Sequence, residues 1–274
     1  MRRFIIILVL SGCYSVCSIM AQAESVNVSS TLDKLFTRLR GDHPSEKKNE
    51  INDSIRSIID SYSISDTVFN HRFINLRFLG QITSPDSLVK IITWNLVIDD
   101  GESSYFCNII KRESKETGIN LFRLKSNYNA GIINKELVYS ISDWYGALYY
   151  DLSPFSFNGS VSYALLGIDY GNSFITRKVI DVLGFEGKEG IVFGSKCFAD
   201  GKTVSSRIVF EYSSTAVMSL RFEADDLIVF DHLSPFSPDL KDNRQFYGPD
   251  FSFDSYRFEK GFWRLKSDID IKNR

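Results

Sequence analysis

The stretch that decides the fold runs from Leu227 to Lys266 and reads LIVFDHLSPFSPDLKDNRQFYGPDFSFDSYRFEKGFWRLK. It begins with an apolar run of strand length, from Leu227 to Phe230, that turn residues bound on both sides. It ends with two strand-like segments on either side of Glu259-Lys260-Gly261, and glycine suits the left-handed position of a three-residue hairpin loop. The stretch therefore predicts β-structure closed by a hairpin, and nothing in it is catalytic by type or spacing.

Composition supports the same fold class. The chain has 274 residues, of which 43% are hydrophobic and 24% are charged, so it is long enough to bury a substantial core. Its 22 Phe and 13 Tyr favour strands over helices. The formal net charge is −2 and no basic stripe occurs, so nucleic acid is not an implied partner.

The N-terminus has the pattern of a signal peptide. Arg2 and Arg3 form a positive n-region, an apolar segment follows, and Ala21-Gln22-Ala23 is a cleavage motif, which predicts cleavage after Ala23. We therefore divide the chain into a signal peptide (1–23), a helical segment (24–66) and an antiparallel β domain (67–274), with no transmembrane span in the mature chain. As an alternative, Leu10 to Cys13 has the form of a bacterial lipoprotein signal with Cys13 as the lipidated residue. Both interpretations imply export.

Export changes how the cysteines are interpreted. Cleavage after Ala23 leaves Cys107 and Cys197, and two cysteines in an oxidising compartment can form a disulfide. The alternative is two buried free thiols, because both lie in apolar, strand-like runs where cysteine is a common small core residue. No C-x-x-C motif or neighbouring histidine accompanies either cysteine, so the pattern does not indicate a zinc site.

Two amphipathic helices are predicted at the start of the mature chain. Leu32, Leu35, Phe36 and Leu39 recur at helical spacing, and Gly41 provides a C-terminal stop. Pro44 suits the first turn of a second helix. The apolar stripe of that second helix consists of Ile51, Ile55, Ile58, Ile59 and Tyr62.

From about Phe69 onward the pattern changes to strands separated by turn dipeptides such as Asp100-Gly101, Asn158-Gly159 and Asp200-Gly201. This predicts a mainly β fold with a hairpin-rich antiparallel sheet, arranged as a sandwich, a barrel or a propeller. One segment departs from the pattern, because helical spacing of apolar residues predicts a short helix over Ser173–Leu183. The other predicted strands span 74–83, 88–98, 105–111, 120–125, 147–152, 161–168, 191–198, 206–212 and 217–222.

Three segments carry a resemblance to a known group of proteins. They are Ser84 to Asn95, Trp144 to Tyr150 and Phe246 to Phe251, and they resemble uncharacterised exported proteins of Bacteroidetes. The resemblance covers most of the mature chain and implies a location in the periplasm or cell envelope of a Gram-negative bacterium. It brings no assigned activity, substrate or catalytic residue.

The same resemblance implies that a short sequence pattern in this chain could be a glycosylation signal. An Asp, a Ser or Thr, and an aliphatic residue in sequence resemble the O-glycosylation signal that Bacteroidetes use on exported proteins. The candidate acceptors are Ser54, Thr67 and Ser87. Ser87 lies in a predicted hairpin turn, so we expect it to be the most exposed of the three.

The chain shows no recognisable catalytic or metal-binding motif. The three histidines, His43, His71 and His232, are far apart in sequence, and none belongs to a metal-binding motif. Asp231 and His232 are adjacent, but neighbours on a strand point to opposite faces, so we do not expect them to act as an acid–base pair. We therefore assign no catalytic residue, cofactor or metal ligand from the sequence.

The aromatic residues near the C-terminus are the best candidate for a binding surface. They are interspersed with hydrogen-bonding residues that suit a sugar or a peptide. The alternation in Phe251-Ser252-Phe253-Asp254, however, predicts that the aromatic face is buried in the sheet core. The aromatic residues are Phe246, Tyr247, Phe251, Phe253, Tyr256, Phe258, Phe262 and Trp263.

The preferred hypothesis for function is a non-catalytic envelope protein, either structural or binding a glycan, a peptide or another envelope protein. The alternative is a secreted hydrolase with an unrecognised site.

Overall fold

The computed structural model describes residues 27–98, 103–114, 118–126, 133–187 and 190–270. The chain divides into two compact units, with the boundary between Phe78 and Leu79. The signal peptide, Cys13 and the cleavage site after Ala23 lie outside the described residues, as does the Asp100-Gly101 turn. The first unit contains the two α-helices and the second contains the strands.

The first unit has the two predicted helices, over residues 27–39 and in α2 (Ser45–Ser63). Pro44 is the N-cap of α2 rather than part of its first turn, and its carbonyl accepts the Lys48 backbone N–H at 3.0 Å. The predicted apolar stripes are largely buried, since Leu32, Phe36, Ile55 and Ile59 are almost inaccessible. Within the described part of the chain, no helix is both long enough and apolar enough to cross a membrane.

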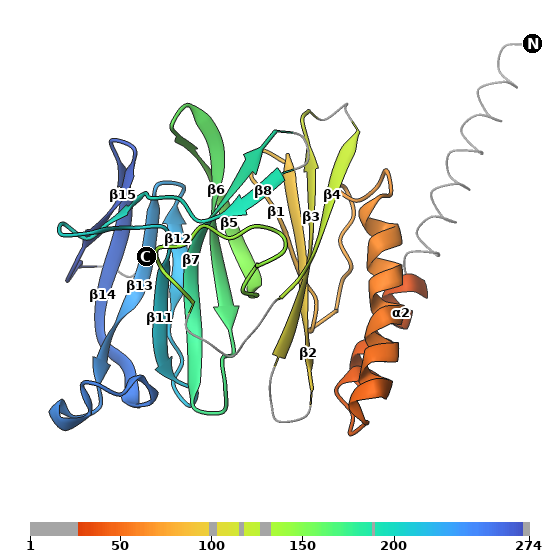
Figure 1. Cartoon of the computed structure of the whole chain (residues 1–274), viewed down its shortest axis with the longest axis horizontal. Helices are drawn as coiled ribbons and strands as arrows, with labels where there is room; N and C mark the ends of the chain where they lie inside the picture. Colours follow the sequence, from red (N-terminus) through yellow and green to blue (C-terminus); the bar gives the residue numbers. More distant parts are fainter. Residues whose placement is uncertain (1–26, 99–102, 115–117, 127–132, 188–189, 271–274) are drawn as a thin grey trace, which may run out of the picture. The chain divides into compact units, whose positions relative to one another are not determined.

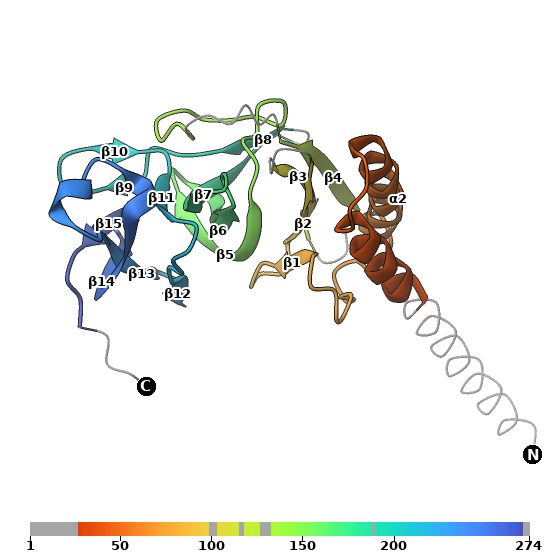
Figure 2. The same cartoon turned by 90° about the horizontal axis from the view of Figure 1, so that it is seen from below.

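The second unit is built of three sheets, which Figures 1 and 2 show side by side. The first contains β1 (Gly80–Thr83), β2 (Val89–Val97), β3 (Ser103–Arg112) and β4 (Ile119–Lys125). The middle one contains β5 (Leu148–Phe157), β6 (Ser160–Asp169), β7 (Ile175–Glu186), β8 (Gly190–Phe193) and β11 (Ile208–Ser213). The third contains β9 (Phe198–Ala199), β10 (Val204–Ser205), β12 (Leu220–Ala224), β13 (Leu227–Pro235), β14 (Tyr247–Glu259) and β15 (Phe262–Lys266).

The predicted fold class is confirmed: the protein is mainly β with antiparallel sheets and two N-terminal helices. Consecutive strands form the hairpins β2–β3, β5–β6, β6–β7 and β14–β15. Among the described strand pairs, β15 with β9 is the parallel one. Two short 3-10 helices, η2 (Pro238–Leu240) and η3 (Arg244–Phe246), lie in the connection between β13 and β14.

The middle sheet is covered on both faces. On β7, Val179 and Leu183 belong to the hydrophobic cluster shared with the first sheet, while Ile180 and Val182 belong to the cluster shared with the third sheet. This alternation is the two-residue period of a strand. The middle sheet therefore separates the two halves of the core.

The predicted helix over Ser173–Leu183 is wrong, because this segment forms most of β7. A strand buried on both faces has an almost continuous apolar run, and such a run also contains residues at helical spacing. Ile175, Val179 and Val182 matched the helical template for this reason. The predicted strand over 191–198 is in fact two strands, β8 and β9, which belong to different sheets.

The closing hairpin forms as predicted, with a shorter loop. Glu259 pairs with Phe262, so the loop consists of Lys260 and Gly261 rather than three residues. Both loop residues have positive φ, 53° and 83°, which is the backbone of the two-residue turns that fit the twist of a hairpin. Lys260 therefore occupies a left-handed position that is usually taken by Asn, Asp or Gly.

The two cysteines are free and buried. Cys107 lies in the cluster between the first and middle sheets, and Cys197 lies in the cluster on the other side of the middle sheet. The structure therefore contains two separate thiols and not the disulfide. Burial raises the pKa of both thiols well above the ordinary value, so both are held in the unreactive protonated form.

Candidate functional site

A β-bulge in the third sheet changes the surroundings of His232. Asp231 pairs with Phe253 and Leu233 pairs with Pro249, so residues 250–252 of β14 lie opposite His232 alone. Bulges of this kind redirect side chains and are frequent beside functional sites. The bulge therefore makes the surroundings of His232 a candidate for a functional site.

The bulge brings His232 to a carboxylate from the neighbouring strand. His232 Nδ1 lies 2.8 Å from Asp254 Oδ2, and the other oxygen of Asp254 accepts the Asp268 backbone N–H at 2.9 Å. Asp231 makes a different contact, because its carboxylate accepts the Ser219 backbone N–H at 2.7 Å. The His232–Asp254 pair was missed from the sequence because its two members are 22 positions apart and meet only through the register of β13 and β14.

The carboxylate environment favours the charged form of His232. The hydrogen bond with Asp254 is the main cause that raises the pKa of the imidazole, the charges of Asp250 and Asp268 add to it, and partial burial opposes it. The Asp254 side chain is 10% exposed, whereas the His232 side chain is 45% exposed. The ring therefore has one nitrogen held by a nearly buried carboxylate and an exposed part that a ligand can reach.

The aromatic residues of β14 do not face the core in the predicted way. Phe251 is 95% exposed and has a left-handed φ of 71°, while Asp254 is buried. The expectation that the Phe251–Asp254 alternation buries its aromatic face is thus wrong, since the bulge interrupts the alternation at Phe251. Further along the same hairpin, Tyr256 and Trp263 are buried as predicted.

A pocket of about 340 Å³ adjoins the His232–Asp254 pair, and we call it the histidine pocket. It lies between the middle and third sheets, with walls from β11, β13 and β14. Its lining residues are Ile133, Lys135, Val209, Phe210, Glu211, Phe230, Asp231, His232, Leu233, Arg244, Asp254, Tyr256 and Leu265. Among the described residues, no group of His, Cys, Asp and Glu side chains is arranged to hold a metal ion.

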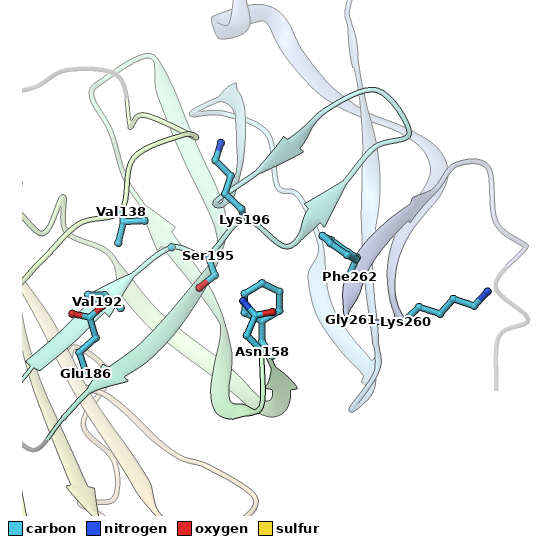
Figure 3. A pocket seen from close by; sticks show the side chains of 11 residues that line it. Val138, Asn158, Glu186, Val192, Ser195, Lys196, Lys260, Gly261 and Phe262 are labelled. Atoms are coloured by element: carbon cyan, nitrogen blue, oxygen red, sulfur yellow. The ribbon is translucent and has the colours of Figure 1, made fainter.

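A larger pocket of about 570 Å³ lies between two hairpin tips, and we call it the hairpin pocket (Figure 3). The β5–β6 turn contributes Phe157 and Asn158, the β14–β15 turn contributes Lys260 to Phe262, and the chain after β8 contributes Gly194 to Lys196. Val138, Glu186 and Val192 complete the lining. In Figure 3, Ser195 and Asn158 lie near the centre, with Phe262 on one side, whereas the Lys260 side chain extends away.

The lining of the hairpin pocket combines apolar surface with unused hydrogen-bonding groups. The half-buried rings of Phe157 and Phe262 belong to the walls. Within the part of the chain that the structure describes, the Asn158 amide, the Ser195 hydroxyl and the Glu186 carboxylate have no hydrogen-bond or ion-pair partner. From the sequence, Asn158 was assigned to a turn and Ser195 to the strand predicted over 191–198, and no sequence signal indicated that the two segments meet.

The predicted glycosylation acceptors differ in exposure. Ser54 on α2 and Thr67 in the following turn are exposed, whereas Ser87 is half-buried. Its neighbour Asp86 accepts hydrogen bonds from the Ser84 hydroxyl and the Tyr163 hydroxyl, which hold the turn against β6. The expectation that Ser87 is the most exposed acceptor is therefore wrong.

Comparison with known proteins adds no assignment. No family model, no curated protein and no solved structure matches this chain.

Proposed function

We propose that this chain is an exported, non-catalytic binding protein of a Gram-negative cell envelope, and that the hairpin pocket takes an uncharged saccharide. The observation that carries the proposal is the lining of this pocket, where two aromatic rings accompany three hydrogen-bonding side chains that have no partner within the described residues. A sugar has apolar C–H faces and a rim of hydroxyls, so it uses both kinds of surface.

Charge disfavours an acidic ligand in this pocket. Lys196 is paired with Glu136 and the Lys260 side chain extends away (Figure 3), which leaves Glu186 as the charged group on the lining without a partner among the described residues. A carboxylate on the lining repels an anion. Asn158 and Ser195 can each donate and accept, which matches the hydroxyl groups of a saccharide.

The location rests on the N-terminal sequence. Arg2, Arg3 and the Ala21-Gln22-Ala23 motif indicate an exported protein, and the resemblance to Bacteroidetes proteins favours a Gram-negative envelope. Export also places the protein among the extracellular and envelope glycans that a saccharide site would meet.

The test is binding of the mature protein to an array of neutral and acidic oligosaccharides, followed by titration of the best neutral one. Asn158→Gly removes the amide and keeps a residue suited to the positive φ of 51°. We expect it to weaken binding about tenfold, the value of one good hydrogen bond. Asn75→Gly is the matched control, because Asn75 also has a positive φ and lies outside the pocket. A preference for acidic sugars, or equal binding by Asn158→Gly, contradicts the proposal.

A secreted hydrolase is the second candidate, and the His232–Asp254 pair is the observation that favours it. A histidine oriented by a carboxylate is the arrangement of a general base or acid. The raised pKa of His232 disfavours the base role near neutral pH, because the protonated ring cannot accept a proton. Turnover of ester, amide or glycoside substrates that is lost in His232→Gln would support the hydrolase.

A further inference from the structure

The histidine pocket has the features of a second ligand site, separate from the hairpin pocket. We propose that it binds a small monoanion made of a carboxylate and an apolar body, with Arg244, Lys135 and His232 as the groups that recognise the carboxylate. This inference does not depend on the saccharide proposal, because the two pockets share no lining residue.

The carboxylates that line the histidine pocket already have partners. Asp254 accepts from His232 and from the Asp268 backbone, and Glu211 accepts Arg177 Nε at 2.8 Å. Asp231 accepts the Ser219 backbone N–H. Each acidic group on the lining is thus engaged by the folded chain.

The two permanent cations on the lining, Lys135 and Arg244, are not engaged in the same way. Among the described residues, neither Lys135 nor Arg244 has a carboxylate within ion-pair distance. The Arg244 guanidinium stacks over the Tyr247 ring at 4.3 Å, which orients it without neutralising it. An oriented guanidinium with free N–H groups is suited to bidentate recognition of a carboxylate.

The hydrogen bond with Asp254 orients His232. Because this bond holds Nδ1, the ring is fixed, and Nε2 has no partner among the described residues. In the protonated ring both nitrogens are donors, which makes Nε2–H a third donor beside the two cations. The groups facing His232 are Asp254, Asp250 and Asp268, with Arg244 on the same pocket lining.

The charge and size of the pocket limit the ligand. With His232 protonated, the lining carries three positive groups, Lys135, Arg244 and His232, and three negative ones, Asp231, Glu211 and Asp254. The attraction for an anion comes from Lys135 and Arg244, which have no ion-pair partner among the described residues, and not from the net charge, which is zero. The carboxylates nearby repel further negative charge, so one charge on the ligand is better accommodated than two. The volume of about 340 Å³ is at the lower end of the range for small-molecule pockets, about 300–1,000 Å³.

The pocket also has apolar walls. Four buried side chains line it, and they favour a hydrocarbon or aromatic group attached to the carboxylate. They are Ile133, Val209, Phe230 and Tyr256, and the partly buried Leu265 adjoins them.

The test compares octanoate with octan-1-ol and octyl phosphate by calorimetric titration of the mature protein at about pH 6, where histidine is largely protonated. We expect octanoate to bind at least about tenfold more tightly than the alcohol, since the carboxylate adds charge-assisted hydrogen bonds. Arg244→Gln should remove most of this preference, and Lys135→Gln should reduce it. Arg264→Gln is the matched control, because Arg264 is also exposed beside an aromatic ring and lies outside this pocket.

Several outcomes would overturn the proposal. Equal binding of octanoate and octan-1-ol, or no binding of octanoate by folded protein, excludes the carboxylate site. Tighter binding of octyl phosphate than of octanoate excludes a site that recognises a carboxylate. Thermal melts identify any variant that fails to fold. If Arg244→Gln and Lys135→Gln both fold and both still prefer octanoate to octan-1-ol, these residues do not recognise the carboxylate. Asn158 lines the hairpin pocket and not the histidine pocket, so Asn158→Gly should leave octanoate binding unchanged. The two proposals can therefore fail independently.

Discussion

Arg207 and Asp181 form an ion pair in which neither side chain is exposed, with Arg207 Nε 3.3 Å from Asp181 Oδ2. Three more donors of the guanidinium are used: Nη1 donates to the carbonyls of Asn134 and Leu137 at 2.6 and 2.7 Å, and Nη2 donates to that of Phe193 at 2.8 Å. The pair thus ties the segment before β5 to β7 and β8. Because the three carbonyls are backbone groups, Arg207 fixes the path of the backbone in these segments.

We expect Arg207→Met to destabilise the fold by about 3–5 kcal/mol, because it leaves the Asp181 charge buried without its cation. The measurement is chemical denaturation of the mature protein. Lys266→Met is the control, since it breaks an exposed pair with Glu259 and should cost far less than the buried pair. Similar costs for the two variants would show that the buried pair is not a main support of the fold.

The closing hairpin offers a test of how burial determines the cost of losing an aromatic ring. Trp263 is fully buried, whereas Phe258 is half-buried and packs on Trp263 and Phe155 with ring centroids 5.3 and 5.1 Å away. We expect Trp263→Ala to cost about 3–5 kcal/mol and Phe258→Ala to cost less than that range. Thermal melts of both variants provide the comparison, and a normal melt for Trp263→Ala would contradict its role in the core.

The sequence predicted the fold class well because two local signals were strong. Glycine-containing turn dipeptides such as Asn158-Gly159 and the short apolar runs both indicate hairpins, and these are properties of a few neighbouring residues. The segment Ser173–Leu183 failed because a strand in a middle layer is apolar on both faces. Its interpretation depends on which sheets cover it, and no local pattern contains that information.

Both candidate pockets depend on long-range contacts. His232 and Asp254 become partners only through the strand register and a bulge, and Asn158 approaches Phe262 only because two hairpin tips meet. Isolated residues of these types are common on surfaces, so they carry no sequence signal. The bulge also changed the expected direction of Phe251, because two extra residues in β14 and the left-handed φ of Phe251 interrupt the regular alternation of the strand.

Processing at the N-terminus has a direct test. The Ala21-Gln22-Ala23 motif leads us to expect a mature N-terminus at Glu24. Intact-mass measurement of protein from the native host, with N-terminal sequencing, determines the cleavage site. A diacylglyceryl group on Cys13 would instead establish the lipoprotein alternative.

The His232–Asp254 pair leads us to expect a pH-dependent stability with a defined sign. Because the folded-state pKa of His232 is raised, its contribution is fully present below the unfolded value of about 6.5 and is lost as the pH rises through the folded pKa. The Tm of the wild type should therefore fall more between about pH 6 and about pH 8 than the Tm of His232→Gln, which cannot titrate. His71→Gln is the control for a histidine elsewhere in the chain. A wild type and a His232→Gln variant with parallel Tm profiles over this range would mean that Asp254 does not stabilise the protonated ring.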